Sequence, residues 1–138
     1  MRSRKLSRVV TILASALLVL SGASVAAGSE GGPAPAPENL RLVVNGQGFV
    51  DRLEWDPPSV GSEPGLYDVN YRFANTGPIG EQVFWSTRDT FLDASSSFGR
   101  FVECTPQHRP DEEWVVWITY RTANGSSERS NQVSMCFP

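Results

Sequence analysis

The feature that most constrains the fold is the Trp-Asp-Pro-Pro run that begins at Trp55, together with the alternating residues before it. Leu53 and Trp55 are apolar, whereas Arg52 and Glu54 are charged, so an extended segment here has one buried and one solvated face. The two prolines end the strand, because each lacks a ladder donor and fixes φ. The run therefore predicts a strand whose tryptophan enters a core.

The same period of two recurs in residues 67–72 and 114–122, and we expect shorter strands at 39–44 and 81–87. Helical periodicity does not occur after residue 37. These patterns predict an all-β, antiparallel β-sandwich with a shared core. The expected core consists of Leu40, Leu53, Trp55, Tyr67, Val69, Tyr71, Trp114, Val116, Ile118 and Tyr120.

Residues 49–73 resemble the fibronectin type III family, whose second strand carries a core tryptophan followed by Pro-Pro and whose third reads Tyr-x-Val-x-Tyr. The resemblance implies seven strands in two sheets, an immunoglobulin-like arrangement. Pro110-Asp-Glu-Glu-Trp114 resembles the family's turn before the sixth strand, and Gly125-x-Ser127-x-x-Ser130 its approach to the last strand. This alignment favours 98–104 over 89–93 as the fifth strand.

Two positions depart from the family pattern. Trp114 replaces the tyrosine whose hydroxyl fixes the corner before the sixth strand. An indole N–H can donate a hydrogen bond but cannot accept one, so any such corner bond would have to be rebuilt. His108 stands where the family usually has leucine, which leaves the local register open.

Residues 1–27 have the composition of a secretory signal peptide. A basic segment precedes an apolar run that is too short to span a bilayer, and Val25-Ala26-Ala27 supplies the small residues that signal peptidase requires. The alternative is an uncleaved membrane anchor. We expect a Gly/Pro/Ala-rich linker at 28–37, one fibronectin type III-like domain at 38–138, and a secreted, monomeric protein.

Removal of the leader makes the protein distinctly acidic. Eight arginines against 15 carboxylates leave a net charge of −7. Nucleic acids and anionic membranes attract the opposite charge, so neither is an expected partner of the secreted chain.

Cys104 and Cys136 both lie in the exported part, where a cysteine pair usually forms a disulfide. In the implied sandwich, the ends of the fifth and seventh strands lie at the same pole, which supports this pairing. Two reduced, buried thiols are the alternative. Because Cys136 is out of phase with Val133 and Met135, we expect the bridge at a frayed strand end outside the core.

The sequence contains no recognisable catalytic constellation, cofactor motif or metal site, so we expect a protein that is not an enzyme. His108 is the only histidine, and its neighbourhood lacks a second ligand or a nucleophile. The acidic turn at 111–113 lacks the spacing of a calcium loop. Asn124 begins a glycosylation sequon that an ordinary hairpin turn explains equally well.

The remaining hypotheses concern recognition and structure. A secreted module could bind an extracellular protein or polysaccharide through loops 56–66, 88–97 and 123–128 or through an aromatic sheet face. Alternatives are a structural spacer, a small secreted enzyme, and a cytokine-receptor-like ligand binder. The last turn is similar to cytokine-receptor modules, although the chain has no Trp-Ser-x-Trp-Ser.

The sheet-face hypothesis depends on Trp117. Alternation places Trp117 on the outer face together with Arg72 and Arg121, where we expect it to be exposed. Tryptophan and arginine are enriched at binding hot spots, so this patch is the candidate docking surface. The alternative is purely structural: an arginine guanidinium stacked on the indole as a cation–π pair.

The leader hypothesis predicts that the secreted protein begins near Gly28. Intact-mass measurement of protein from culture supernatant should show the loss of residues 1–27, because signal peptidase cleaves after small residues such as Ala27. A secreted form that retains Met1 would contradict this assignment.

Overall fold

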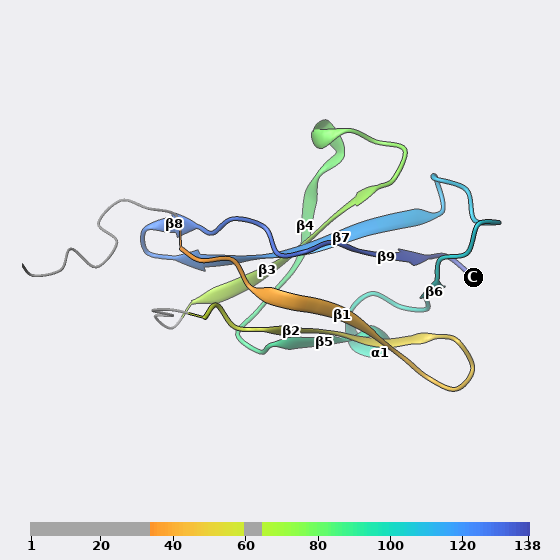
Figure 1. The fold of residues 1–138 in the computed structure, drawn as a ribbon, viewed down its shortest axis with the longest axis horizontal. Helices are drawn as coiled ribbons and strands as arrows, with labels where there is room; N and C mark the ends of the chain where they lie inside the picture. The colour runs from red at the N-terminus through yellow and green to blue at the C-terminus, as the bar shows by residue number, and fades with distance from the viewer. Residues whose placement is uncertain (1–33, 60–64) are drawn as a thin grey trace, which may run out of the picture.

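The computed structural model describes residues 34–59 and 65–138; the predicted leader and most of the linker lie outside these ranges. Two sheets pack face to face (Figure 1), which confirms the predicted β-sandwich. The smaller sheet has the order β1 (Glu38–Val44), β2 (Val50–Asp56), β5 (Phe91–Asp93). The larger has the order β4 (Gln82–Thr87), β3 (Leu66–Phe73), β7 (Glu113–Thr122), β9 (Val133–Cys136), β6 (Val102–Glu103), and β8 (Gly125–Ser126) pairs with β7.

Two short helices complete the described chain: a 3-10 turn, η1 (Pro78–Gly80), precedes β4, and α1 (Ala94–Ser97) follows β5. Neither helix is long and apolar enough to cross a membrane.

The predicted core is confirmed, and Trp55 lies at its centre. The Trp55 ring contacts the edge of Tyr67 with ring centroids 5.6 Å apart, and Tyr67 contacts Tyr120 at 5.0 Å. These contacts join β2 of the smaller sheet to β3 and β7 of the larger one. Leu40, Leu53, Val69, Val116 and Ile118 are buried around them, while Tyr71 and Trp114 are partly buried against the same cluster.

Trp114 organises an aromatic cluster at one end of the core. Tyr71 stacks on it at 4.2 Å between centroids, and Phe101 lies 4.8 Å away. Its indole Nε1 is buried and has no hydrogen-bond partner among the described residues. Trp114 therefore does not replace the corner hydrogen bond that the family's tyrosine makes.

Glu112 holds that corner instead. Its carboxylate accepts a hydrogen bond from the Arg109 backbone N–H at 3.0 Å, and its carbonyl accepts one from the Phe137 N–H at 3.1 Å. The turn before β7 is thus tied both to itself and to the end of the chain.

The prediction of the fifth strand at 98–104 is wrong. The strand that pairs with β2 is β5, in which buried Leu92 lies opposite Leu53. Within 98–104, only β6 is extended, and it pairs with β9 in the other sheet. Phe98 and Phe101 are spaced by three residues rather than two and pack in the aromatic cluster, so this segment does not alternate as a strand does.

The Cys104–Cys136 disulfide is confirmed, with Cα atoms 5.0 Å apart. The expectation that it lies outside the core is wrong for Cys136, which is fully buried beside Met135. The reason is β6: β9 is paired on both sides, by β7 and by β6, so its end is covered rather than frayed.

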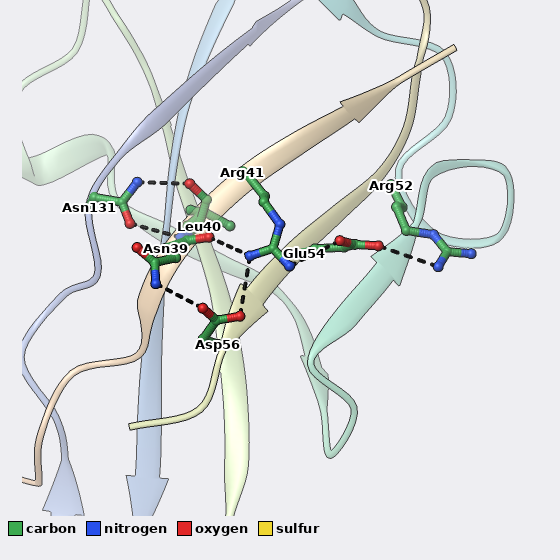
Figure 2. A network of polar contacts seen from close by, with 7 residues as sticks. All are labelled: Asn39, Leu40, Arg41, Arg52, Glu54, Asp56 and Asn131. Atoms are coloured by element: carbon green, nitrogen blue, oxygen red, sulfur yellow. Dashed lines mark hydrogen bonds and ion pairs between the residues drawn. The ribbon is translucent and has the colours of Figure 1, made fainter. Parts of the chain in front are cut away.

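The end of the predicted linker belongs to the sandwich, because Pro37 is buried and Ala34 packs against the core. The adjacent strand β1 is held by one side chain of the opposite layer. The Asn131 amide accepts a hydrogen bond from the Leu40 N–H and donates one to the Leu40 carbonyl, each 2.8 Å long (Figure 2).

Substitutions of Trp55 should measure the contribution of the central contact. Trp55→Ala should lower the free energy of unfolding by about 3–5 kcal/mol, because it leaves a large cavity between the sheets. Trp55→Phe should cost clearly less, since it keeps a ring and removes an indole N–H that has no partner in the described chain. Urea unfolding gives both values, and equal midpoints for parent and Trp55→Ala would contradict this account.

Candidate functional site

The outer face of the larger sheet carries the three residues predicted to form a docking patch. The register of β3 and β7 places Asn70 opposite Trp117 and Arg72 opposite Val115. Since core residues alternate with these positions, their side chains point away from the core. Arg121 lies further along the same face of β7.

The expectation that Trp117 is exposed is wrong, because only 2% of the residue is accessible. The Arg129 guanidinium lies over its ring, with Cζ 4.5 Å from the centroid. This guanidinium donates to both carboxylate oxygens of Glu81, at 2.7 and 2.6 Å. The stacked cation–π arrangement therefore occurs, with Arg129 in place of Arg72 or Arg121.

Arg72 and Arg121 contact other groups. Arg121 forms an ion pair of 2.8 Å with Asp68, which is nearly buried, and also donates to Ser86. Arg72 donates to the Thr76 carbonyl at 2.9 Å and so stabilises the turn after β3. Both predicted binding residues thus have structural partners.

Two serines position Arg129 beside β7. The backbone N–H groups of Tyr120 and Ile118 donate to the hydroxyls of Ser127 and Ser130, at 2.8 and 2.9 Å. Both serines are buried, so the segment between them is held along the strand without being a strand itself. The Ser-x-x-Ser spacing was the sequence signal that could have placed Arg129 next to Trp117.

A groove of about 620 Å³ lies above this covered indole; we call it the Trp117 groove. Val83 and Trp117 are its apolar residues. The other lining residues can all form hydrogen bonds: Asn70, Glu81, Gln82, Thr119, Ser126, Ser127, Glu128 and Arg129. The groove is thus a polar concavity with a small apolar floor.

The Glu81–Arg129 pair also determines the charge state of the groove. The hydrogen bonds from Arg129 hold the pKa of the Glu81 carboxyl below its usual value of about 4.5. The same bonds raise the pKa of Arg129. Both groups therefore stay charged at neutral pH, and the cover over Trp117 persists.

The outer face of the smaller sheet carries a network of its own (Figure 2). Arg41 pairs with Glu54 at 3.1 Å and Asp56 at 3.3 Å, and Arg52 pairs with Glu54 at 3.6 Å. Hydrogen bonds from Asn39 and Arg41 lower the pKa of Asp56. A concavity of about 800 Å³ beside this network is lined in part by Arg52, Glu54 and Asp93, whose charges pair with one another.

The predicted loops differ in what they present. Loop 56–66 includes residues 60–64, which lie outside the described ranges. Segment 88–97 is not a free loop, because it contains β5 and α1. The 123–128 segment is the β7–β8 hairpin, with Asn124 exposed at its tip.

The remaining polar candidates have structural contacts. His108 Nδ1 accepts a hydrogen bond from the Thr105 N–H at 2.9 Å and closes the turn after Cys104. Arg109 pairs with Asp111 at 3.2 Å. In ranges 34–59 and 65–138, no three His, Cys, Asp or Glu side chains are grouped so that they could hold a metal ion.

Comparison with solved structures identifies the architecture. The chain is similar to the fibronectin type III domain of human fibronectin type III domain containing protein 3, with a TM-score of 0.51 and 19% identity, over 80% of this chain and 94% of that one. The chain has the fibronectin type III fold. No family model matches the sequence, and no curated protein matches it.

Two titin structures show the same fold. Domains A168-A170 from titin match with a TM-score of 0.51 and 16% identity, over 77% of this chain and 32% of that one. Titin kinase and its flanking domains match with 0.53 and 13%, over 77% and 17%. The chain thus spans less than a third of either titin structure, and such likeness shows the fold alone.

The covering ion pair should make stability depend on pH. Because the folded-state pKa of Glu81 is depressed, its contribution is present above about pH 4.5 and is lost as the pH falls through the folded-state value. Glu81→Gln should therefore lower the urea midpoint at pH 7, and by a smaller amount at pH 3. Glu128→Gln, which removes another carboxylate of the groove, is the control and should change neither midpoint; parallel shifts of both variants would contradict the assignment.

Proposed function

We propose that this fibronectin type III fold serves as a secreted, non-catalytic recognition module that binds an extracellular polysaccharide or protein in the Trp117 groove. The observation that carries the proposal is the lining of the groove: hydrogen-bonding side chains surround the exposed side chain of Val83, and Trp117 lies buried beneath Arg129. Ligand sites typically combine an apolar surface with a few placed polar groups.

This lining favours a hydroxyl-rich ligand, and a polysaccharide is the best fit. Gln82 offers an amide, Ser126 a hydroxyl, and Glu128 a carboxylate that accepts hydrogen bonds. Asn70 is buried, and its amide nitrogen already donates to the Asp68 carbonyl and the Thr119 hydroxyl. The apolar face of a sugar ring can rest on Val83, while its hydroxyls replace water around the rim. The acidic net charge of the secreted chain agrees with a neutral rather than an anionic ligand.

Secretion is supported by two independent features. The leader at 1–27 predicts export, and the Cys104–Cys136 disulfide is compatible with an oxidising, extracellular compartment. The fold supports a binding or structural role rather than catalysis, because its structural neighbours are fibronectin type III and immunoglobulin-like domains.

Affinity gel electrophoresis against a panel of soluble polysaccharides tests the proposal. At least one polysaccharide should retard the parent, and the double variant Ser126→Ala/Glu128→Ala should bind it about tenfold more weakly, since it removes two rim hydrogen bonds. Gln47→Ala, an exposed change in the β1–β2 hairpin of the other sheet, should bind like the parent.

Immobilised parent and double variant, probed with purified extracellular proteins, form the second arm of the test. Binding of a protein that the double variant loses would identify a protein ligand in the same groove. Equal binding by parent and double variant in both arms would exclude the groove and favour a structural spacer.

A further inference from the structure

Strand β4 forms one edge of the larger sheet, and no strand of the described ranges pairs with its far side. Large exposed hydrophobic side chains are concentrated there. Five occur in the described chain, and three of them, Ile79, Val83 and Trp85, belong to η1 and β4. An exposed apolar edge is a template for pairing with a further strand.

The other sheet edges are short or already occupied. The Asn131 amide bonds to both backbone groups of Leu40 and so covers part of the β1 edge. β5 has three residues and β6 two, which limits any pairing. β4 has six residues, Gln-Val-Phe-Trp-Ser-Thr, without a charge or a proline. It therefore lacks the usual chemical protection of an edge strand.

A bulge interrupts β4 and gives the strand a symmetrical pattern of faces. Trp85 pairs with Val69 and Val83 with Asn70, so Phe84 is the extra residue. Phe84 packs on Tyr71 in the core, and Trp85 lies opposite core residue Val69. Judged by their partners on β3, the inner positions are Gln82, Phe84, Trp85 and Thr87, and the outer positions are Val83 and Ser86. Gln82 is exposed at the end of the strand, so its side chain also lines the Trp117 groove.

We propose that two copies of the chain pair through antiparallel β4 strands, with a two-fold axis between Phe84 and Trp85. The order of faces, inner-outer-inner-inner-outer-inner, reads the same in both directions about this point. Each Val83 then lies opposite Ser86 of the second copy, and each Trp85 opposite Phe84. A partner strand without a bulge alternates regularly, so beyond Phe84 its inward side chains would lie opposite outward side chains of β4. A second copy has the same bulge, so inward residues stay opposite inward residues along the whole strand.

The charges at the two ends of β4 also favour a second copy of the chain as the pairing partner. In this register, Glu81 of one copy lies opposite Arg88 of the other, and the symmetry forms this pair twice. Arg88 is exposed and makes no ion pair within residues 34–59 and 65–138. The Glu81 carboxylate, already bonded to Arg129, has further lone pairs for a second guanidinium.

Such pairing replaces the monomer expected from the sequence with a dimer, joins the two larger sheets into one, and places both Trp117 grooves on the same face. It needs no ligand, so it goes beyond the proposed function and can be tested separately.

Sedimentation equilibrium of the secreted protein without ligand tests the pairing. The parent should dimerise, and Arg88→Glu should raise the dissociation constant about tenfold or more, because it places two carboxylates together at each end. Glu81→Arg should weaken dimerisation likewise. An equimolar mixture of the two variants should recover it, because both opposite-charge pairs re-form. Arg100→Glu, an exposed charge reversal outside β4, is the control and should dimerise like the parent.

Cysteine pairing tests the register. Val83→Cys mixed with Ser86→Cys should form a disulfide-linked heterodimer, since opposed Cα atoms lie about 4.5–5.5 Å apart, within disulfide range. Neither variant alone should link, because like positions are offset by three residues, about 10 Å. A parent that stays monomeric up to about 1 mM, a range of weak association, overturns the proposal. A dimer unaffected by Arg88→Glu, or linked equally by each single variant, overturns it too.

Discussion

The contact of Trp55 with Tyr67, and of Tyr67 with Tyr120, is the interaction on which the rest of the structure depends. It joins the middle strand of the smaller sheet to the two central strands of the larger one. Because side chains alternate along a strand, holding these rings in the core also determines which residues point outward. Asn70 and Trp117 face outward for this reason, and the Trp117 groove is a consequence of how the core is packed.

The long strands could be predicted from the sequence because their information is local. Residues 114–122 alternate over many positions, and one face is almost entirely apolar. The fifth strand could not be predicted in this way, since β5 has three residues and a helical turn follows it. The cysteine pairing was predictable, but the burial of Cys136 was not, because it depends on β6 pairing with β9 across a long separation.

For the candidate site, the sequence indicated which side of the sheet Trp117 faces, but not that other residues cover it. Period-two alternation correctly placed Trp117, Arg72 and Arg121 on one side of the larger sheet. The burial of Trp117 arises from Glu81 and Arg129, which are 48 residues apart and meet only in the folded chain. No local sequence pattern predicts a contact between two residues so far apart in the chain. A tryptophan on an outward position is therefore weak evidence for exposure until the neighbouring segments are placed.

The groove and the β4 edge share Glu81, Gln82 and Val83, and this makes their proposed functions interdependent. Val83 lies on the groove floor and on the strand that would pair with a second copy. Glu81 holds Arg129 over Trp117 and would also receive Arg88 of the second copy. A ligand that displaces Arg129 would free carboxylate oxygens for Arg88, whereas a ligand that needs Glu81 itself would compete with it. Linkage is reciprocal, so a ligand that changes the dimerisation constant by a given factor when it fills both grooves must bind each groove of the dimer and of the monomer with affinities that differ by the square root of that factor.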